Sequence, residues 1–157
     1  MLKKICFVCM GNICRSPLAE GIFKHLIKQA QLDDRFQIES AAIGSWHVGE
    51  SPDTRAHRTA QAHGIRLEST AQQFRAKDFS RFDVVLALDG EIADDLHRLA
   101  PSLLDRQKIR LLREYDPQAQ AGDDLDVPDP YYGRQEDFER AYQMIERSCE
   151  ALLKEIK

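Results

Sequence analysis

The chain has 157 residues, of which 43% are hydrophobic and 31% charged, a composition that is typical of a globular protein with a hydrophobic core. Its net charge of −4 and its pI near 5.7 argue against nucleic acid or an anionic membrane as a partner held by bulk charge. No apolar run reaches the roughly 20 residues of a membrane span, and the four cysteines fit a reducing compartment. We therefore expect one cytoplasmic domain over residues 1–157, without membrane insertion.

The first segment that carries chemistry joins a strand to a helix. The apolar run Ile5–Val8 predicts a buried strand, and Ser16-Pro17 predicts a helix start, with Ser16 as N-cap and Pro17 in the first turn. The residues between read Cys-Met-Gly-Asn-Ile-Cys-Arg over 9–15. This segment is therefore predicted to form a loop at a helix N-terminus, where unpaired backbone N–H groups attract anions.

This loop combines an anion cradle with a nucleophile. We expect the backbone N–H groups of residues 10–15 to converge on one anion, with Gly11 supplying backbone angles that other residues avoid. Arg15 adds a planar guanidinium that matches two phosphate oxygens. Cys9 is expected at the floor of this ring, where the N–H groups and the helix dipole stabilise a thiolate.

The rest of the chain alternates strands with helices. An alternation of this kind predicts an α/β fold: a single-domain, four-stranded parallel sheet with helices on both faces, in a Rossmann-like three-layer arrangement. Ligands of such sheets bind at the loops that follow the strands. The expected elements are a helix over 18–31, a strand over 36–41, a helix over 51–63 that begins at Ser51-Pro52, a strand over 82–88, a helix over 91–99 that follows Asp89, a strand over 108–112 and a helix over 136–157.

A long acidic loop over 116–133 offers a general acid. Its prolines exclude a helix, and loops of this length in compact domains are usually functional or disordered. A carboxylic acid there can donate a proton to a leaving group opposite Cys9. Composition alone does not choose among the four carboxyl groups in its second half, Asp123, Asp124, Asp126 and Asp129.

The string Cys9-Met-Gly-Asn-Ile-Cys-Arg-Ser-Pro17 resembles the signature of the low-molecular-weight protein tyrosine phosphatases. The resemblance implies that Cys9 is the nucleophile of a phosphocysteine mechanism, that Arg15 binds phosphate, and that Asp129, in Asp129-Pro130-Tyr131, is the general acid. It also implies the roles of the neighbouring residues. Met10, Gly11, Asn12, Ile13, Cys14 and Arg15 bind phosphate; Asn12 and Ser16 support the loop and the thiolate; Ile13, Trp46, Tyr131 and Tyr132 line the substrate site. Separately, because Cys14 lies close to Cys9 in the sequence, we hypothesise that it is a redox partner that forms a reversible disulfide with Cys9.

Several positions keep more than one interpretation. Ser16 is a helix cap, a donor to the thiolate, or both. Trp46 either forms a wall of the substrate site or packs on the body of the protein. His47 either contacts the phosphate rim or, as we expect, lies in solvent. Asp89 caps the helix that follows it or supports the phosphate site. Cys149 falls on the apolar stripe of the last helix and is expected in the core.

Other activities share this loop. Arsenate reductases need further cysteines, and none lies between Cys14 and Cys149. Protein arginine phosphatases tend to carry Thr where this chain has Ile13. A phosphate-binding module without enzymatic activity would need neither Cys9 nor Asp129. We therefore expect a monomeric phosphatase, without metal or organic cofactor, that acts on phosphotyrosine-containing proteins such as a bacterial tyrosine kinase and on small aryl phosphates.

Overall fold

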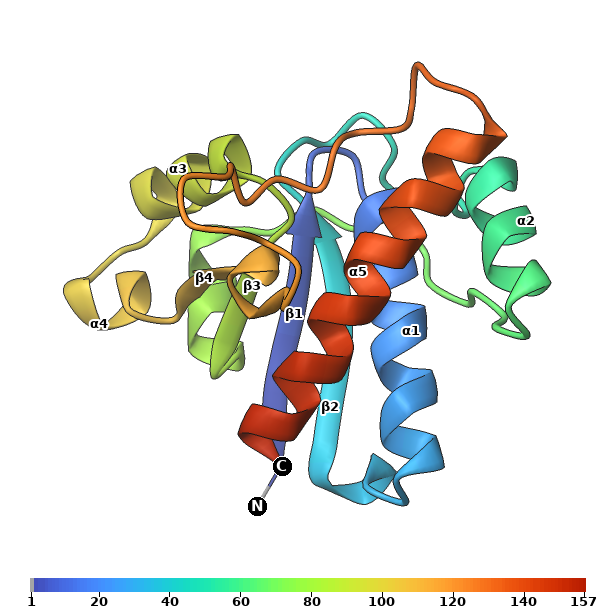
Figure 1. Ribbon diagram of the computed structural model, residues 1–157. Coiled ribbons are helices and arrows are strands. Elements are labelled where there is room, and N and C mark those ends of the chain that lie inside the picture. The colour runs from blue at the N-terminus through green and yellow to red at the C-terminus, as the bar shows by residue number, and fades with distance from the viewer. Residues whose placement is uncertain (1) are drawn as a thin grey trace.

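The structure, a computed structural model, describes residues 2–157 and contains a four-stranded parallel sheet with the strand order β2-β1-β3-β4. This arrangement confirms the predicted fold, because helices cover both faces of the sheet (Figure 1). The strands are β1 (Lys3–Cys9), β2 (Phe36–Ala42), β3 (Val84–Ala87) and β4 (Ile109–Leu111). The helices are α1 (Arg15–Gln29), η1 (Asp33–Arg35), α2 (Thr54–Ala62), η2 (Ala76–Arg81), α3 (Gly90–Leu99), α4 (Leu103–Arg106), η3 (Leu112–Tyr115) and α5 (Gln135–Ile156).

Strand β1 divides the core in two because its side chains alternate between the faces of the sheet. Ile5 and Phe7 pack under α1 and α5, together with the apolar stripe of α5 that includes Cys149. Cys6 and Val8 face the opposite way, into a second apolar cluster that includes Ile92 of α3. A strand buried on both faces is central to the sheet, so the position of the loop after β1 is fixed by the core.

Two helix starts differ from the prediction. Helix α1 begins at Arg15, its N-cap is Cys14, and no side chain makes the capping hydrogen bond. The prediction of Ser16 as N-cap is therefore wrong, because this side chain is fully buried and hydrogen-bonded elsewhere. The second correction concerns α2, which begins at Thr54 with Asp53 as the cap that accepts from the Arg55 N–H.

The strand order places the end of β1 at a topological switch point. The chain leaves β1 to one side to form β2 and returns on the other side to form β3. The end of β3 lies beside the end of β1, since the Leu88 N–H donates to the Val8 carbonyl at 3.1 Å. The loop after Cys9 and the residues after Leu88 therefore meet where such sheets bind ligands.

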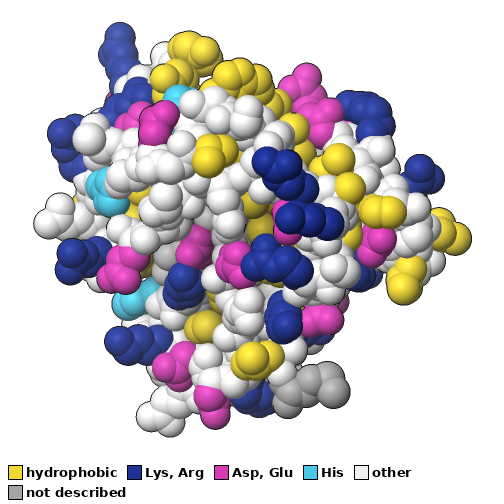
Figure 2. Space-filling model, turned by 180° about the vertical axis from the view of Figure 1, so that it is seen from behind, with side chains coloured by type: hydrophobic (Ala, Val, Ile, Leu, Met, Phe, Trp, Pro, Cys, Tyr) yellow, Lys and Arg dark blue, Asp and Glu magenta, His cyan; other side chains and the backbone are white. Residues whose placement is uncertain are grey.

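The surface shows no dominant charge on the face that is turned away in Figure 1. Acidic and basic side chains alternate across most of this face (Figure 2). Within residues 2–157, no helix combines the length and the apolar character that crossing a bilayer requires.

A buried ion cluster holds the acidic loop to α5. The Asp116 carboxylate is fully buried and accepts hydrogen bonds at 3.1 Å from Arg113 and from Arg147 of α5. Arg113 also donates to the Asp126 carbonyl at 2.9 Å, so the cluster fixes the loop that leads to Asp129. Burial alone would raise the pKa of Asp116, but the hydrogen bonds from Arg147, Gln118 and Arg113 outweigh it and lower that pKa.

We expect Asp116→Ala to reduce the free energy of unfolding by about 3 kcal/mol, because it leaves two guanidinium groups without their buried partner. The lowered pKa means that the contribution of Asp116 is present above about pH 4 and is lost as the pH falls further. Urea unfolding measures the loss. Arg98→Ala is the control, because it removes an exposed ion pair with Asp95 and should cost about 1 kcal/mol or less. Equal losses in both variants would contradict the assigned role.

Candidate active site

The loop between β1 and α1 has one residue in the left-handed region. This residue is Asn12, with φ of 58°, and not Gly11 as predicted. Asn12 is held there by its side chain, which donates to Ser16 Oγ at 2.7 Å and to Ser40 Oγ at 3.0 Å and accepts from the Gln72 N–H at 3.0 Å. Gly11 instead makes room for a neighbour, since a Cβ atom there would lie 3.0 Å from the His47 ring, which would have to shift.

Two groups donate to the sulfur of Cys9. The Asn12 N–H lies 3.3 Å from Sγ, and Ser16 Oγ lies 3.0 Å from it. Ser16 Oγ accepts a hydrogen from the Asn12 amide, and its own hydrogen has two acceptors within reach, the Cys9 sulfur at 3.0 Å and the Ala41 carbonyl at 3.5 Å, of which the sulfur is the nearer. Donors that converge on a sulfur atom favour its negatively charged form.

The other three cysteines are different in kind. Burial raises the pKa of Cys6, of Cys14 and of Cys149, and all three stay protonated at neutral pH. Cys149 is fully buried on α5, as expected. Nearby acidic groups, Asp53 first among them, raise the pKa of Cys14 further. Cys9 is thus the cysteine whose surroundings suit a nucleophile at the cavity.

Arg15 is a nearly buried cation beside Cys9. Its Nη1 donates to Asp89 Oδ2 at 2.6 Å and to the Val127 carbonyl at 2.9 Å, and its Nη2 lies 3.7 Å from Asp129 Oδ2. Burial opposes the charge, but Cys9, Asp89 and Asp129 together raise the pKa of Arg15. The guanidinium is therefore permanently charged and held in a fixed orientation.

Asp89 caps α3, which was one of its two expected roles, and also pairs with Arg15. Its Oδ1 accepts from the Ile92 N–H at 2.8 Å and caps α3, while its Oδ2 pairs with Arg15. The cap anchors the carboxylate, and the anchored carboxylate orients the guanidinium toward the cavity.

The cavity distinguishes the four carboxyl groups of the acidic loop. Each of them accepts from a backbone N–H group: Asp123 from Gln120, Asp124 from Asp126, Asp126 from Gly90 and Asp129 from Tyr131. Among these four, Asp129 is the one that lines the cavity, and its side chain is 46% exposed. A carboxyl group that is half-exposed and faces Cys9 is free to exchange protons with a bound molecule and with water.

A cavity of about 490 Å³ opens above the loop. Its lining includes the loop residues from Cys9 to Arg15 except Asn12, together with Trp46, His47, Asp129, Tyr131 and Tyr132. The rings of Tyr131 and Tyr132 meet edge to face with their centroids 4.9 Å apart. Trp46 is 70% exposed at the lip, with its ring against Gly44, where a Cβ would collide with it. His47 lies half-buried in the wall, not in solvent as expected.

Arg55 holds the aromatic lip against α2. It donates to the carbonyls of Tyr131 at 2.9 Å and of Gly133 at 3.0 Å, and it forms two hydrogen bonds at 3.0 Å to the carboxylate of Asp53. The backbone N–H of Asp53 donates to the Ile13 carbonyl at 2.8 Å. This pair of side chains therefore connects the loop of Cys9 to the loop of Asp129.

Sequence reasoning assigned no role to Ser40, Gln72 or Arg55. One feature could have pointed to Ser40: it is a residue with a hydroxyl group near the end of β2, the strand that pairs with β1, and it lies opposite Phe7. The contact of Gln72 uses its backbone N–H, which no sequence pattern marks. No group of three or more His, Cys, Asp or Glu side chains within residues 2–157 is arranged to hold a metal ion.

Comparison with known proteins decides the family. A family model described as low molecular weight phosphotyrosine protein phosphatase matches residues 4–157. The chain belongs to this family. The resemblance of its Cys9–Pro17 segment to the signature of the low-molecular-weight phosphatases is thereby confirmed.

Individual members of the low-molecular-weight phosphatase family are similar over almost their whole length. A low molecular weight protein-tyrosine-phosphatase from Streptomyces coelicolor is 46% identical, over 100% of this chain and 95% of the relative. A protein tyrosine phosphatase from Entamoeba histolytica has a crystal structure with a TM-score of 0.92 at 32% identity, and the match covers 98% and 96% of the two chains. A drosophila arginine phosphatase superposes with a TM-score of 0.90 at 34% identity and 98% coverage of both chains.

Proposed function

We propose that this enzyme hydrolyses phosphotyrosine monoesters in proteins through a phosphocysteine intermediate on Cys9. The observation that carries the proposal is the placement of a sulfur atom with two hydrogen-bond donors in the same cavity as a fixed guanidinium and a half-exposed carboxyl group. These are the groups that a nucleophilic displacement at phosphorus requires.

The first step forms a sulfur–phosphorus bond. The phosphate is bound by Arg15 and by the backbone N–H groups of the P-loop, residues 10–15. The Cys9 thiolate attacks phosphorus while the bond to the tyrosine oxygen breaks, and Asp129 donates its proton to that oxygen. The product tyrosine leaves, and the phosphoryl group stays on sulfur.

The second step returns the enzyme to its starting state. The Asp129 carboxylate accepts a proton from a water molecule, which attacks phosphorus. The sulfur–phosphorus bond breaks, inorganic phosphate is released, and Cys9 is again a thiolate. Hydrogen bonds from Ser16 and Asn12 stabilise this thiolate as a leaving group.

The substrate class follows from the lip of the cavity. Ile13, Trp46, Tyr131 and Tyr132 supply apolar and aromatic surface on which a phenyl ring can pack. Arginine phosphatase activity is the second candidate, because one structural neighbour is a drosophila arginine phosphatase. Ile13 favours the first candidate, since this side chain is buried in the wall and carries no hydrogen-bonding group for a guanidinium.

Arsenate reduction is disfavoured by the burial of the remaining cysteines. Such a reaction would pass oxidation from the active site to a further thiol. Apart from Cys9 and Cys14, the chain offers Cys6 and Cys149, which are both buried in the core.

Matched peptides test the substrate class. We expect kcat/KM for a phosphotyrosine peptide to exceed that for the same peptide with phosphoarginine by at least about tenfold. Phosphoserine, which is too short to bring its phosphate to Cys9 from the aromatic lip, should be a poorer substrate than phosphotyrosine. Preference for phosphoarginine would replace the proposed activity with the second candidate.

The proposal extends to the setting of the enzyme. We place it in the cytoplasm as a monomer with one domain over residues 1–157, acting on a phosphotyrosine-containing protein such as a bacterial tyrosine kinase and needing no metal or organic cofactor. We also propose that Cys14 forms a reversible disulfide with Cys9 that protects the nucleophile from further oxidation. Mass spectrometry of peroxide-treated protein should show this linkage, and its absence would exclude the protective role.

A further inference from the structure

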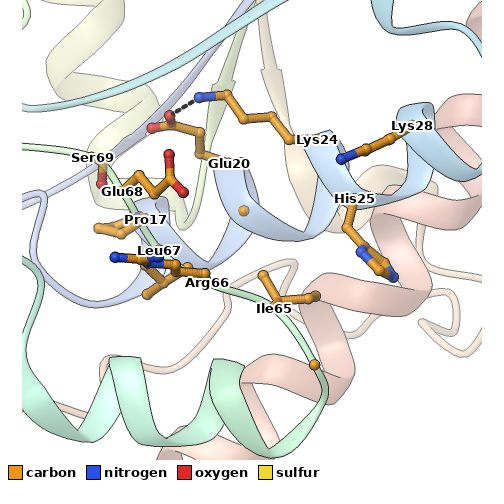
Figure 3. A pocket seen from close by; sticks show the side chains of 12 residues that line it. Pro17, Glu20, Lys24, His25, Lys28, Ile65, Arg66, Leu67, Glu68 and Ser69 are labelled. Carbon is orange, nitrogen blue, oxygen red and sulfur yellow. Dashed lines mark hydrogen bonds and ion pairs between the residues drawn. The ribbon is translucent and has the colours of Figure 1, made fainter.

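A second cavity, of about 250 Å³, lies between α1 and the segment 64–69, away from the cavity of Cys9. Glu20 and Lys24 of α1 line it, and Figure 3 shows their side chains pointing toward one another. Lys24 Nζ donates to Glu20 Oε2 at 2.6 Å. The Glu20 side chain is 10% exposed, whereas that of Lys24 is 51% exposed, so the pair connects the buried interior to the surface.

The second oxygen of Glu20 begins a chain of hydrogen bonds that ends at Cys9. Ser40 Oγ donates to Glu20 Oε1 at 2.5 Å. The Asn12 amide then donates to Ser40 Oγ at 3.0 Å and to Ser16 Oγ at 2.7 Å, and Ser16 lies 3.0 Å from the sulfur. Asn12, Ser16 and Ser40 are each at most 2% exposed.

Neighbouring groups fix the direction of the hydrogen bond from Ser40 to Glu20 and of those from Asn12 to the two serines. A carboxylate only accepts hydrogen bonds, so Ser40 must donate its single hydroxyl hydrogen to Glu20. The Ser40 oxygen then accepts a hydrogen bond from Asn12. The Asn12 amide cannot turn around, because its oxygen accepts from the Gln72 N–H. Both of its hydrogens are therefore donated, and the Ser16 hydroxyl hydrogen is shared between the sulfur at 3.0 Å and the more distant Ala41 carbonyl at 3.5 Å.

We infer that Glu20 is a positioning residue that acts through Ser40, Asn12 and Ser16 to stabilise the Cys9 thiolate. The inference deepens the proposed function and rests on it. A carboxylate at the start of the chain polarises the hydrogen bonds in one direction, and bonds in series within a buried network strengthen one another. Without the carboxylate, the Ser40 hydroxyl is free to turn its hydrogen toward Asn12, which opposes the donation on which Ser16 depends.

Glu20 and Cys9, at the two ends of this series of hydrogen bonds, have different charged and titratable neighbours. Lys24 faces Glu20 from the same helix, and Glu68 and Arg66 face the cavity from the opposite segment, with His25 and Lys28 further along α1 (Figure 3). Cys9 instead faces Arg15, Asp129, His47 and Cys14. A substitution at Glu20 thus leaves every charged neighbour of Cys9 in place.

The test measures the ionisation of Cys9 directly. Glu20→Met keeps the side-chain volume and removes the acceptor, and Glu20→Ala serves if the first variant does not fold. The rate of Cys9 alkylation by iodoacetamide, followed across pH, reports the fraction of thiolate. We expect the pH midpoint to rise by about 0.5 to 1 unit, with kcat/KM for p-nitrophenyl phosphate about threefold to tenfold lower below that midpoint.

Two further variants separate this role from a structural one. Glu68→Ala removes a carboxylate from the same cavity without touching the chain of hydrogen bonds, and it should leave the midpoint unchanged. In a Ser40→Ala background, Glu20→Met should add no further shift, since its path to Cys9 is already broken. A lower melting temperature with an unchanged midpoint, an equal shift in Glu68→Ala, or additive shifts would each overturn the inference. If the proposed function itself were wrong, the wild-type enzyme would show no turnover, which none of the outcomes above includes.

Discussion

Replacement of Cys9 by serine is expected to lower kcat for p-nitrophenyl phosphate by at least about 10⁴-fold. Serine keeps the shape of the side chain, and Ser16 and Asn12 can still donate to it. An alcohol is a far weaker acid than a thiol, however, and among residues 2–157 the groups that hydrogen-bond to the Cys9 sulfur are the Ser16 hydroxyl and the Asn12 N–H, neither of which is a general base. Turnover by the purified variant measures the loss.

A matched variant shows that the loss is specific to one sulfur atom. Cys149→Ala removes a thiol that is fully buried on α5, and its turnover should match that of the wild type at a temperature where both are folded. Activity of Cys9→Ser within tenfold of the wild type would rule out the covalent mechanism.

Replacement of Asp129 by alanine is the second large effect. General acid–base catalysis contributes about 10²- to 10⁴-fold, and Asp129 is the loop carboxyl group that lines the cavity, so kcat/KM for phosphotyrosine should fall by this amount. The fall should be smaller for p-nitrophenyl phosphate, because a leaving group of low pKa departs without a proton. A series of aryl phosphates of increasing leaving-group pKa measures the difference.

The neighbouring aspartate provides the control for this prediction. Asp123→Ala removes an exposed carboxylate from the same loop, whose hydrogen bond is to the Gln120 N–H and not to the cavity. Its activity should stay within about twofold of the wild type for all esters. A loss in Asp129→Ala that does not depend on the leaving group would contradict the role of general acid.

The elements that the sequence predicted well are those with strong local signals. The apolar run of β1 contributes to both halves of the core, and the three-and-four periodicity of α5 places one face of that helix in one of them, so pattern and packing agree. The predicted start of α1 was wrong because serine often caps helices, whereas the hydroxyl of Ser16 makes tertiary contacts with Cys9 and Asn12 instead. The start of α2 was wrong for a related reason, since Asp53 caps the helix while its N–H binds the Ile13 carbonyl.

The parts of the site that were not predicted depend on contacts between distant segments. The resemblance named Cys9, Arg15 and Asp129, and the structure places all three around one cavity. Glu20 gave no sequence signal, because a glutamate on an amphipathic helix normally faces solvent. Its role is visible only when β2 brings Ser40 beside the end of β1. The same is true of Arg55, whose contacts with Tyr131 and Gly133 span more than 70 residues.

The phosphocysteine intermediate can be observed directly. Wild-type enzyme that is turning over p-nitrophenyl phosphate is quenched rapidly into denaturant, digested and examined by mass spectrometry. We predict one phosphoryl group on the peptide that contains Cys9, and none on the corresponding peptide of Cys9→Ser. Turnover at the wild-type rate with every phosphoryl group on another residue, or with no phosphorylated peptide at any quench time, would contradict the mechanism.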